Sequence, residues 1–333
     1  MDYRDLGRTG VQVSPLCLGC MNFGGKTEPE DAYRIIDRAI EAGINFIDTA
    51  NVYSRGRSET VTGEALKRNG RREYVVLATK VHGRMADDDP NALGNSRRHI
   101  IAQCEESLKR LQTDWIDLYQ IHRPQPSVPI DETLRALDDL IRAGKVRYIG
   151  TSTFAAWQVV EALWTARELG LNRFVCEQPP YNILDRRIER ELLPMARTYG
   201  TATIPWSPLA GGLLTGKYSG GEKAPAGSRY AGREDATDRW NETVFKVLDQ
   251  LRPVAERLGC TLSQLALRWC LDQPGVTSPI MGPRTLEQLE DNLGALDTAL
   301  DDEARAAIDA AVAPGSVVSP FYNADFGPHR HRL

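Results

Sequence analysis

Short apolar runs alternate with amphipathic helical patterns along this chain of 333 residues, and that alternation limits the folds open to it. Most of the runs, such as 74–78, are apolar at nearly every position, which is typical of parallel strands buried on both faces. We predict eight strands, over 16–20, 45–48, 75–80, 116–121, 146–151, 174–178, 202–206 and 277–281.

Helical periodicity separates these runs. The clearest pattern covers 29–42, where apolar side chains recur on one face. Thr27 and Glu30 have the spacing of a capping box before this helix, and Gly43 follows its end. Similar helices are predicted at 97–111, 131–143, 155–169, 186–199 and 301–312, with others beginning near Asn241, Thr261 and Thr285.

The repeated strand–helix unit predicts an α/β fold, a (β/α)8 TIM barrel, as a single domain over 1–333. A doubly wound sheet would need a Gly-rich turn after its first strand, and no G-x-G-x-x-G occurs in the sequence. Short strands at 3–6 and 11–13 predict an N-terminal β-hairpin before the barrel. The stretch 216–240, after the seventh strand, lacks helical periodicity and is predicted to be a long loop insertion, and 313–333 to be a C-terminal loop or tail.

Composition argues against several classes of function. Lys and Arg total 41 and Asp and Glu total 45, so the net charge of -4 gives no general attraction to nucleic acid or to anionic membranes. The chain has no long apolar run, and its first residues lack the apolar stretch of a signal peptide, so we expect a cytoplasmic protein. Cys17 and Cys20 form a C-x-x-C pair, but in a strand this spacing places the two sulfurs on opposite faces. We therefore expect core thiols and no metal site.

Polar residues follow the predicted strands at equivalent places. Asp48, Lys80 and His122 each come at the end of a different apolar run. The carboxyl ends of barrel strands meet at one face, where the active sites of such barrels lie. Each of these side chains is costly to bury alone, so we expect them to converge, with Asp48 and Lys80 as an ion pair. The other strands end in Ser152, Gln178, Trp206 and Gly282.

Tyr53 lies five residues after Asp48 and adds a possible proton donor to this set. A phenol is ordinarily a poor acid, with a pKa of about 10. A neighbouring ammonium group such as that of Lys80 stabilises the phenolate. We therefore predict that Tyr53 acts as a general acid, that Asp48 holds Lys80 in place, and that His122 polarises the group that accepts the proton.

The same segments carry a resemblance to a known family. In order along the chain, 43–53, 77–80, 117–122, 148–152, 178–182 and 206–217 resemble the aldo-keto reductases, and they are most similar to the bacterial branch that resembles the potassium-channel β subunits. The resemblance implies a (β/α)8 barrel that binds NADPH without a Rossmann fold and reduces aldehydes or ketones. It implies a catalytic tetrad of Asp48, Tyr53, Lys80 and His122, with Tyr53 as proton donor and with Tyr53 and His122 in contact with the substrate.

The resemblance also implies residues that bind the cofactor. Ser152 and Gln178 match positions that form hydrogen bonds with the nicotinamide carboxamide, and Trp206 matches the aromatic residue that stacks on the nicotinamide ring. Residues of 206–217 match a loop that crosses the pyrophosphate, and the insertion 216–240 would cover the cofactor.

Arg284 matches the position that binds the 2'-phosphate of NADPH. It stands beside a predicted helix N-terminus, where Thr285 and Gln288 have the spacing of a capping box and where the backbone amides favour an anion. The full set of cofactor contacts that the resemblance implies is Gly19, Cys20, Met21, Asp48, Ser152, Gln178, Trp206, Ser207, Leu209, Gly211, Lys217, Arg229, Gly282, Arg284, Gln288 and Asn292.

The predicted function is therefore an NADPH-dependent reductase of a small carbonyl substrate, with no nucleic-acid or membrane partner. One alternative is a non-catalytic, NADPH-sensing subunit, since the channel-associated relatives act partly in that way. Another is a sugar-nucleotide keto or enoyl reductase. Family members that reduce carbon–carbon double bonds of steroids carry Glu at the position of His122, so His122 favours carbonyl reduction.

The segment 211–217 approaches a Walker P-loop, but Tyr218 cannot supply the hydroxyl that such a loop places on magnesium. Neither the substrate nor the oligomeric state can be predicted from the sequence. The segments expected to line a substrate pocket are 22–23, 81–93, 123–128 and 321–326.

Overall fold

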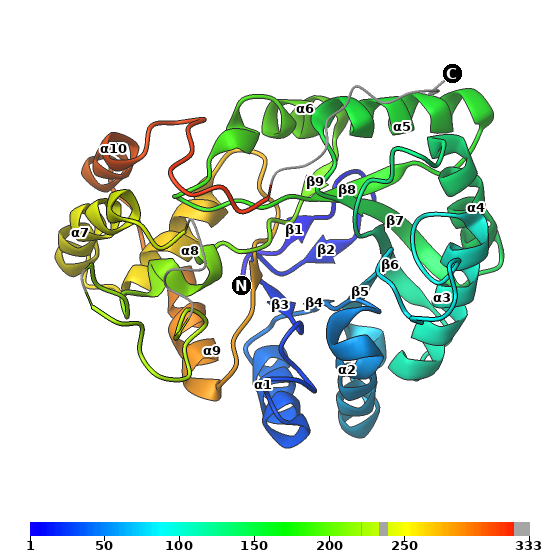
Figure 1. Cartoon of the computed structure of the whole chain (residues 1–333), viewed down its shortest axis with the longest axis horizontal. Coiled ribbons are helices and arrows are strands. Elements are labelled where there is room, and N and C mark those ends of the chain that lie inside the picture. The colour runs from blue at the N-terminus through cyan, green and yellow to red at the C-terminus, as the bar shows by residue number, and fades with distance from the viewer. Residues whose placement is uncertain (221, 233–238, 323–333) are drawn as a thin grey trace.

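The computed structural model describes residues 1–220, 222–232 and 239–322 and shows the predicted barrel (Figure 1). Its main sheet has eight parallel strands in the order β10-β3-β4-β5-β6-β7-β8-β9 among the described residues. The strands are β3 (Cys17–Gly19), β4 (Phe46–Asp48), β5 (Val76–Val81), β6 (Ile116–Ile121), β7 (Val146–Ser152), β8 (Phe174–Gln178), β9 (Ala202–Thr203) and β10 (Ile280–Met281).

The sheet closes on itself between its first and last members. Thr277 donates its backbone N–H to the carbonyl of Thr203 at 2.7 Å, and Ile280 donates to the carbonyl of Pro205 at 2.8 Å. These bonds join the segments of β9 and β10, so no long edge is left at that seam. The named part of β9 is shorter than the predicted 202–206 because Pro205 has no N–H to donate, although Trp206 resumes the pairing by donating to Pro179.

Helices on the outside of the barrel connect successive strands (Figure 1). A single α-helix follows each strand from β3 to β8, and α7 and α8 both lie between β9 and β10 in the described chain. The helices are α1 (Pro29–Glu41), α2 (Arg57–Asn69), α3 (Arg97–Leu111), α4 (Ile130–Arg142), α5 (Ala156–Leu169), α6 (Leu192–Tyr199), α7 (Glu242–Arg257), α8 (Leu262–Asp272), α9 (Leu286–Leu293) and α10 (Asp302–Ala311).

Helix α2 has no counterpart among the helices predicted from periodicity. Its buried face includes Ser58, Glu59, Thr62 and Gly63 beside a few apolar side chains, so the apolar stripe that marks an amphipathic helix is weak. The polar members are satisfied inside the protein: the Ser58 hydroxyl, for example, donates to the carbonyl of Cys20 at 2.7 Å.

The predicted cap of the first helix is wrong. Helix α1 begins at Pro29, and its N-cap is Glu28 in an extended conformation, without a side-chain cap. A residue before proline is restricted to such conformations, so Pro29 fixes where the helix starts. The hydroxyl of Thr27 donates instead to the carbonyl of Arg284 at 3.2 Å. The predicted end is confirmed, since Gly43 follows the helix with φ +93°.

The N-terminal hairpin, β1 (Arg4–Asp5) and β2 (Gln12–Val13), covers one end of the barrel (Figure 1). Leu6 and Val13 are fully buried in a cluster with barrel-interior side chains such as Phe46 and Leu118. Arg4 adds a polar link, because its Nη1 donates to the carbonyls of Leu271 and Val276, each at 3.0 Å. The hairpin thus closes the end of the barrel from which the strands start.

Several boundaries differ from the prediction. The helix predicted over 186–199 is a 3-10 turn at Arg187–Glu189 followed by α6, and the described residues of 216–240 contain no strand or α-helix. Residues 221, 233–238 and 323–333, which belong to the predicted insertion and tail, lie outside the described residues. In the part of the chain that the structure covers, no helix is long and apolar enough to cross a membrane.

Candidate active site

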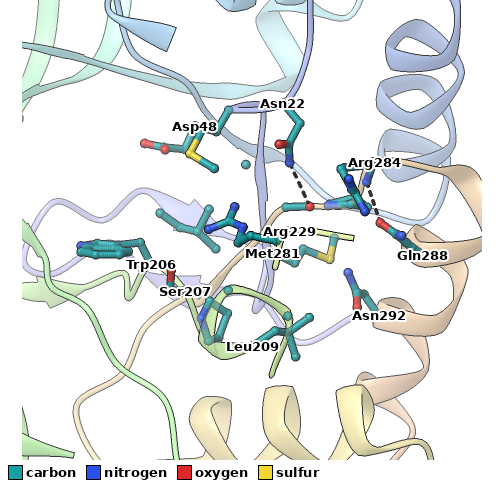
Figure 2. Close-up of a pocket in the computed structure, with 18 of the residues that line it drawn as sticks. Asn22, Asp48, Trp206, Ser207, Leu209, Arg229, Met281, Arg284, Gln288 and Asn292 are labelled. Atoms are coloured by element: carbon teal, nitrogen blue, oxygen red, sulfur yellow. Dashed lines mark hydrogen bonds between the residues drawn. The ribbon is translucent and has the colours of Figure 1, made fainter. Parts of the chain in front are cut away.

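One cavity of about 590 Å³ opens at the carboxyl ends of the strands, and nearly all the predicted site residues lie on its wall. Figure 2 shows Asp48 and Trp206 toward one end, with Arg284, Gln288 and Asn292 at the other. Predicted residues on the wall are Gly19, Met21, Asp48, Tyr53, His122, Ser152, Gln178, Trp206, Ser207, Leu209, Gly211, Lys217, Arg229, Gly282, Arg284, Gln288 and Asn292.

The four predicted catalytic residues converge at one end of this cavity. Lys80, fully buried behind the wall, donates from Nζ to Asp48 Oδ2 at 2.5 Å and to the hydroxyl of Tyr53 at 3.3 Å. The rings of Tyr53 and His122 meet edge to face, with their centroids 5.6 Å apart. Asp48 and Lys80 lie in the adjacent strands β4 and β5, His122 directly follows the next strand, β6, and Tyr53 comes from the loop after β4. The expected convergence is therefore observed.

The second carboxylate oxygen of Asp48 accepts two amide hydrogen bonds. Gln120 Nε2 and Gln178 Nε2 each lie 3.1 Å from Asp48 Oδ1, and Gln178 also donates to Gln120 Oε1 at 3.1 Å. Gln120 was missed from the sequence because it lies inside a strand, two residues before the polar residue that ends it. Its Oε1 and Asp48 Oδ1 both accept from Gln178 Nε2 and so fix which way the Gln178 amide faces. Gln120 therefore belongs to the site although it does not line the cavity.

The charges around Lys80 and His122 set their protonation. Burial acts to lower the pKa of Lys80, but the carboxylate of Asp48 and the hydroxyl of Tyr53 together outweigh it and raise that pKa. Burial, and after it the charges of Lys80 and Arg123, hold the pKa of His122 well below its ordinary value. At neutral pH the site therefore presents an ammonium group and a neutral imidazole side by side.

Tyr53 begins a strained turn. The two residues after it, Ser54 and Arg55, have φ of +48° and +53°, and Gly56 has φ +92°. Successive left-handed residues other than glycine are unfavourable, and such strain is concentrated at functional sites. The turn lets the chain reverse directly from the Tyr53 phenol into helix α2, which begins at Arg57.

A buried carboxyl organises the neighbouring loop. Glu177 accepts hydrogen bonds from the Thr151 hydroxyl and from the backbone N–H of Phe154, and burial raises its pKa to about 8. Between these donors lie Ser152, whose hydroxyl donates to the carbonyl of Gln178 at 2.8 Å, and Thr153, with φ +61°. Glu177 therefore stabilises the unusual backbone that holds Ser152 at the cavity.

The other end of the cavity gathers positive charge. Lys217, Arg229 and Arg284 line it, and none of them forms an ion pair within the described residues. Burial, then the charges of Arg284 and Arg229, lower the pKa of Lys217. Three cations that repel one another and find no protein anion make a place prepared for an anionic ligand. The acids nearby on the wall are Glu287 and Asp291 of α9.

The backbone of Arg284 is held by hydrogen bonds to its N–H and to its carbonyl. The hydroxyl of Thr285 caps α9 by accepting from the backbone N–H of Gln288 at 3.3 Å, which is half of the predicted capping box. The side chain of Gln288 instead accepts from the N–H of Arg284 at 2.9 Å (Figure 2). With Thr27 bonded to the Arg284 carbonyl, the arginine backbone is tied to α9 and to the loop before α1.

Some predicted contacts lie off the wall. Cys20 does not line the cavity: its N–H donates to the carbonyl of Asp48, and its own carbonyl accepts from Ser58. Cys17 is likewise a buried free thiol. Of the segments expected to line a substrate pocket, Asn22 and Arg123 do so, while 323–326 lie outside the described residues. Wall residues not predicted include Lys26, Pro208, Gly212, Thr215, Ser263, Met281, Pro283, Glu287 and Asp291.

Comparisons with known proteins agree with this geometry. The model of the aldo/keto reductase family matches residues 15–313. The uncharacterized oxidoreductase YrpG of Bacillus subtilis (strain 168) is 44% identical over 315 residues, which cover 91% of this chain and 93% of the relative.

Two further relatives are named as probable voltage-gated potassium channel subunits beta. The protein of Oryza sativa subsp. japonica is 40% identical and that of Arabidopsis thaliana 39% identical, each over 304 residues. In both, the match covers 89% of this chain and 92% of the relative. The resemblance seen in the motifs is confirmed. The chain belongs to the aldo/keto reductase family and, with it, to the oxidoreductases.

Proposed function

We propose that the protein is an NADPH-dependent reductase of aldehydes or ketones in which Tyr53 is the proton donor. The observation that carries the proposal is the single cavity that joins the Tyr53–His122 pair to the cations Lys217, Arg229 and Arg284. One end offers proton-transfer groups, and the other offers charges for phosphates. A dinucleotide has a reactive ring and phosphates joined in one molecule, which suits such a cavity.

The residues present fit a nicotinamide dinucleotide. Trp206 presents an aromatic ring to the cavity, and its buried Nε1 has no hydrogen-bond partner among the described residues. Gln178 donates its two amide N–H groups to Asp48 and Gln120, so its Oε1 is the atom left to accept a hydrogen bond from a carboxamide NH2 group. Gly211 and Gly212 have φ of +64° and +101° and let the backbone pass close to a pyrophosphate.

NADPH is favoured over NADH by the cations. Arg284 is held by its backbone at the N-terminal end of α9, and its Nη1 donates only to the carbonyl of Gly227, at 3.3 Å, within the described residues. A 2'-phosphate would give this guanidinium the anion that it otherwise lacks. Gln288 and Asn292 lie beside it on the cavity wall and would face the adenosine end.

The chain's own groups would handle the proton. A bound reduced nicotinamide would supply the hydride that a carbonyl group needs. Lys80, 3.3 Å from the phenol oxygen, stabilises the phenolate that remains when Tyr53 donates its proton, and Asp48 keeps Lys80 in place. The neutral imidazole of His122 can donate a hydrogen bond to the same substrate oxygen, which orients the carbonyl against Tyr53.

The names of two relatives raise a second role, that of a channel-associated subunit. An assembly role requires no proton-transfer machinery. Here the four residues are all present and in contact, which supports turnover. The two roles are compatible on one chain, so the measurement of turnover decides only whether the protein is an enzyme.

The test is consumption of NADPH, followed by its absorbance, with a panel of aldehydes, diketones, quinones and ketosugars. We expect turnover with at least one class and faster turnover with NADPH than with NADH at equal concentration. Absence of turnover across the panel, in protein whose tryptophan fluorescence shows that NADPH is bound, would refute the catalytic proposal.

A further inference from the structure

Arg123 stands at the catalytic end of the cavity and follows His122 directly in the chain. Its Nη1 donates to the carbonyl of His122 at 2.7 Å and to the hydroxyl of Thr153 at 3.4 Å. Both bonds use one nitrogen. In the described chain no partner is found for Nε or Nη2, which form the edge of a guanidinium that can bind an anion with two parallel bonds.

Two aromatic rings hold this guanidinium. Its central carbon lies 4.9 Å from the ring centroid of Tyr322 and 5.8 Å from that of Trp206. Contacts of this kind orient a guanidinium without neutralising its charge. The arginine is therefore fixed in direction, half-buried, and still able to form charge-assisted hydrogen bonds.

No protein acid neutralises Arg123 within the part of the chain that the structure covers. The carboxyl of Glu177 feels its charge, but Thr151 and Phe154 occupy the Glu177 oxygens, and the two side chains form no ion pair. On the cavity wall, Asp48 is already paired with Lys80, and Glu287 and Asp291 belong to α9 at the other end. Among the described residues, the catalytic end thus carries a positive charge without a protein counter-ion.

We propose that Arg123 binds a carboxylate of the substrate, so that the substrates are carbonyl compounds carrying a carboxylate close to the reacting carbon. This inference rests on the proposed reductase function. The planar guanidinium edge matches the two oxygens of a carboxylate, and the bond to the His122 carbonyl holds it within one residue of the imidazole that faces the substrate oxygen. A neutral substrate would leave that charge without a partner in a partly desolvated site.

The test compares substrates that differ in charge and hardly in size. The kcat/KM for 3- and 4-formylbenzoate is divided by that for the corresponding formylbenzamides, for wild type, Arg123→Gln and Arg123→Lys. Arg147→Gln is the matched control, since Arg147 is exposed at the start of β7, away from the cavity. Each charge-assisted hydrogen bond lost corresponds to about tenfold or more in affinity.

We expect wild type and Arg147→Gln to prefer the acid over the amide. In Arg123→Gln the kcat/KM for the acid should fall more than that for the amide, so that the acid-to-amide ratio decreases by about tenfold or more, and Arg123→Lys should keep part of the preference. Calorimetric titration with benzoate and benzamide in the presence of NADP+ should show the same pattern in binding.

Three outcomes would overturn the proposal. Equal losses for acid and amide would mean that Arg123 acts only by holding the His122 carbonyl. Unchanged kcat/KM for both acid and amide would mean that the carboxylate binds elsewhere, and a higher kcat/KM for 4-formylphenyl phosphate than for 4-formylbenzoate would assign the arginine to phosphates. Failure of every aldehyde to consume NADPH would instead refute the reductase function itself.

Discussion

Lys80 and Asp48 form an ion pair that solvent does not reach: Nζ lies 2.5 Å from Oδ2, and the two side chains are 0% and 3% exposed. Taking two charges out of water is expensive, and a pair of this kind is retained only with good geometry and further hydrogen bonds. Asp48 has them, because Gln120 and Gln178 satisfy its other oxygen. The pair therefore contributes both to the stability of the barrel and to the arrangement of the candidate active site at the carboxyl ends of its strands.

Breaking this pair on one side should destabilise the protein more than removing both charges. Lys80→Met leaves Asp48 buried without its cation. We therefore expect the free energy of unfolding, measured in urea, to fall by about 3–5 kcal/mol. The double variant Asp48→Asn, Lys80→Met should regain most of that loss while lacking turnover. As a control, Arg55→Met, which breaks the exposed pair with Asp87, should change stability little. A double variant as unstable as the single one would contradict this account.

Tyr53→Phe should abolish the proton donor and keep the ring against His122. General acid catalysis contributes about 10²–10⁴-fold, so kcat should fall at least a hundredfold. NADPH affinity, measured by quenching of tryptophan fluorescence, should remain within about twofold, since the phenol is not among the groups assigned to the cofactor. Turnover at the wild-type rate would exclude Tyr53 as the donor.

Glu177 should make stability fall as the pH rises. Its pKa is raised by burial to about 8 in the folded protein, against about 4.3 in an unfolded chain. A raised pKa means that the folded state holds the proton more tightly, so its stabilising contribution is complete below about pH 4.3 and is lost as the pH rises toward 8. Between those values the loss is at most about 1.4 kcal/mol per pH unit.

The measurement for Glu177 is urea unfolding of wild type and Glu177→Gln at pH 6 and pH 9. The amide keeps an oxygen for the Phe154 N–H, and the Thr151 hydroxyl can accept from its NH2 group. We expect the variant to gain stability relative to wild type at pH 9 compared with pH 6. A difference that does not change with pH would show that Glu177 is ionised throughout.

Gln120→Met should lower both stability and cofactor affinity, although Gln120 does not line the cavity. Methionine fills a similar volume but neither donates to Asp48 nor accepts from Gln178. The lost buried hydrogen bonds should lower stability by about 1–3 kcal/mol, and cofactor affinity should fall because the Gln178 amide is free to turn. Gln250→Met, on the exposed face of α7, should stay within about 0.5 kcal/mol of wild type. Unchanged cofactor affinity in Gln120→Met would mean that Asp48 alone orients Gln178.

Arg284→Ala should weaken the binding of NADPH and leave the binding of NADH nearly unchanged. A charge-assisted contact with the 2'-phosphate contributes about 1.5–3 kcal/mol, which corresponds to roughly ten- to 150-fold in NADPH affinity. NADH has no group that meets this arginine, and the wild-type preference for NADPH should decrease at raised ionic strength. Arg34→Ala, on the exposed face of α1, is the control. Equal losses for both nucleotides would mean that Arg284 contacts something they share.

The sequence predicted the barrel and the clustering of Asp48, Lys80 and His122 because both depend on simple patterns. Parallel strands buried on two faces are apolar throughout, so Asp48, Lys80 and His122 were conspicuous as the polar residues that end them. The topology then places strand ends together. No further information was needed to expect that these side chains meet.

Features that depend on tertiary partners were not predictable in this way. Helix α2 was missed because Ser58 and Glu59 on its buried face find partners elsewhere in the barrel, which periodicity does not show. Thr27 was assigned to a helix cap, whereas its hydroxyl bonds to Arg284, distant in sequence. Gln120 is a polar residue inside a strand, and only the positions of Asp48 and Gln178 reveal its purpose.

The pairing of β3 with β10 has a consequence for how the protein is made. Cys17 and Ile280 are partners in the β-ladder, and Arg4 donates hydrogen bonds to carbonyls near residue 271. Segments that are synthesised first therefore lack their partners until segments near residue 280 have been synthesised. Until residue 281 has left the ribosome, one edge of β3 has unpaired N–H and C=O groups and can pair with another chain. Contacts this distant in sequence also slow folding. The nascent chain is therefore exposed to misassembly for nearly the whole of translation, and chaperone demand should end only when the last strand arrives.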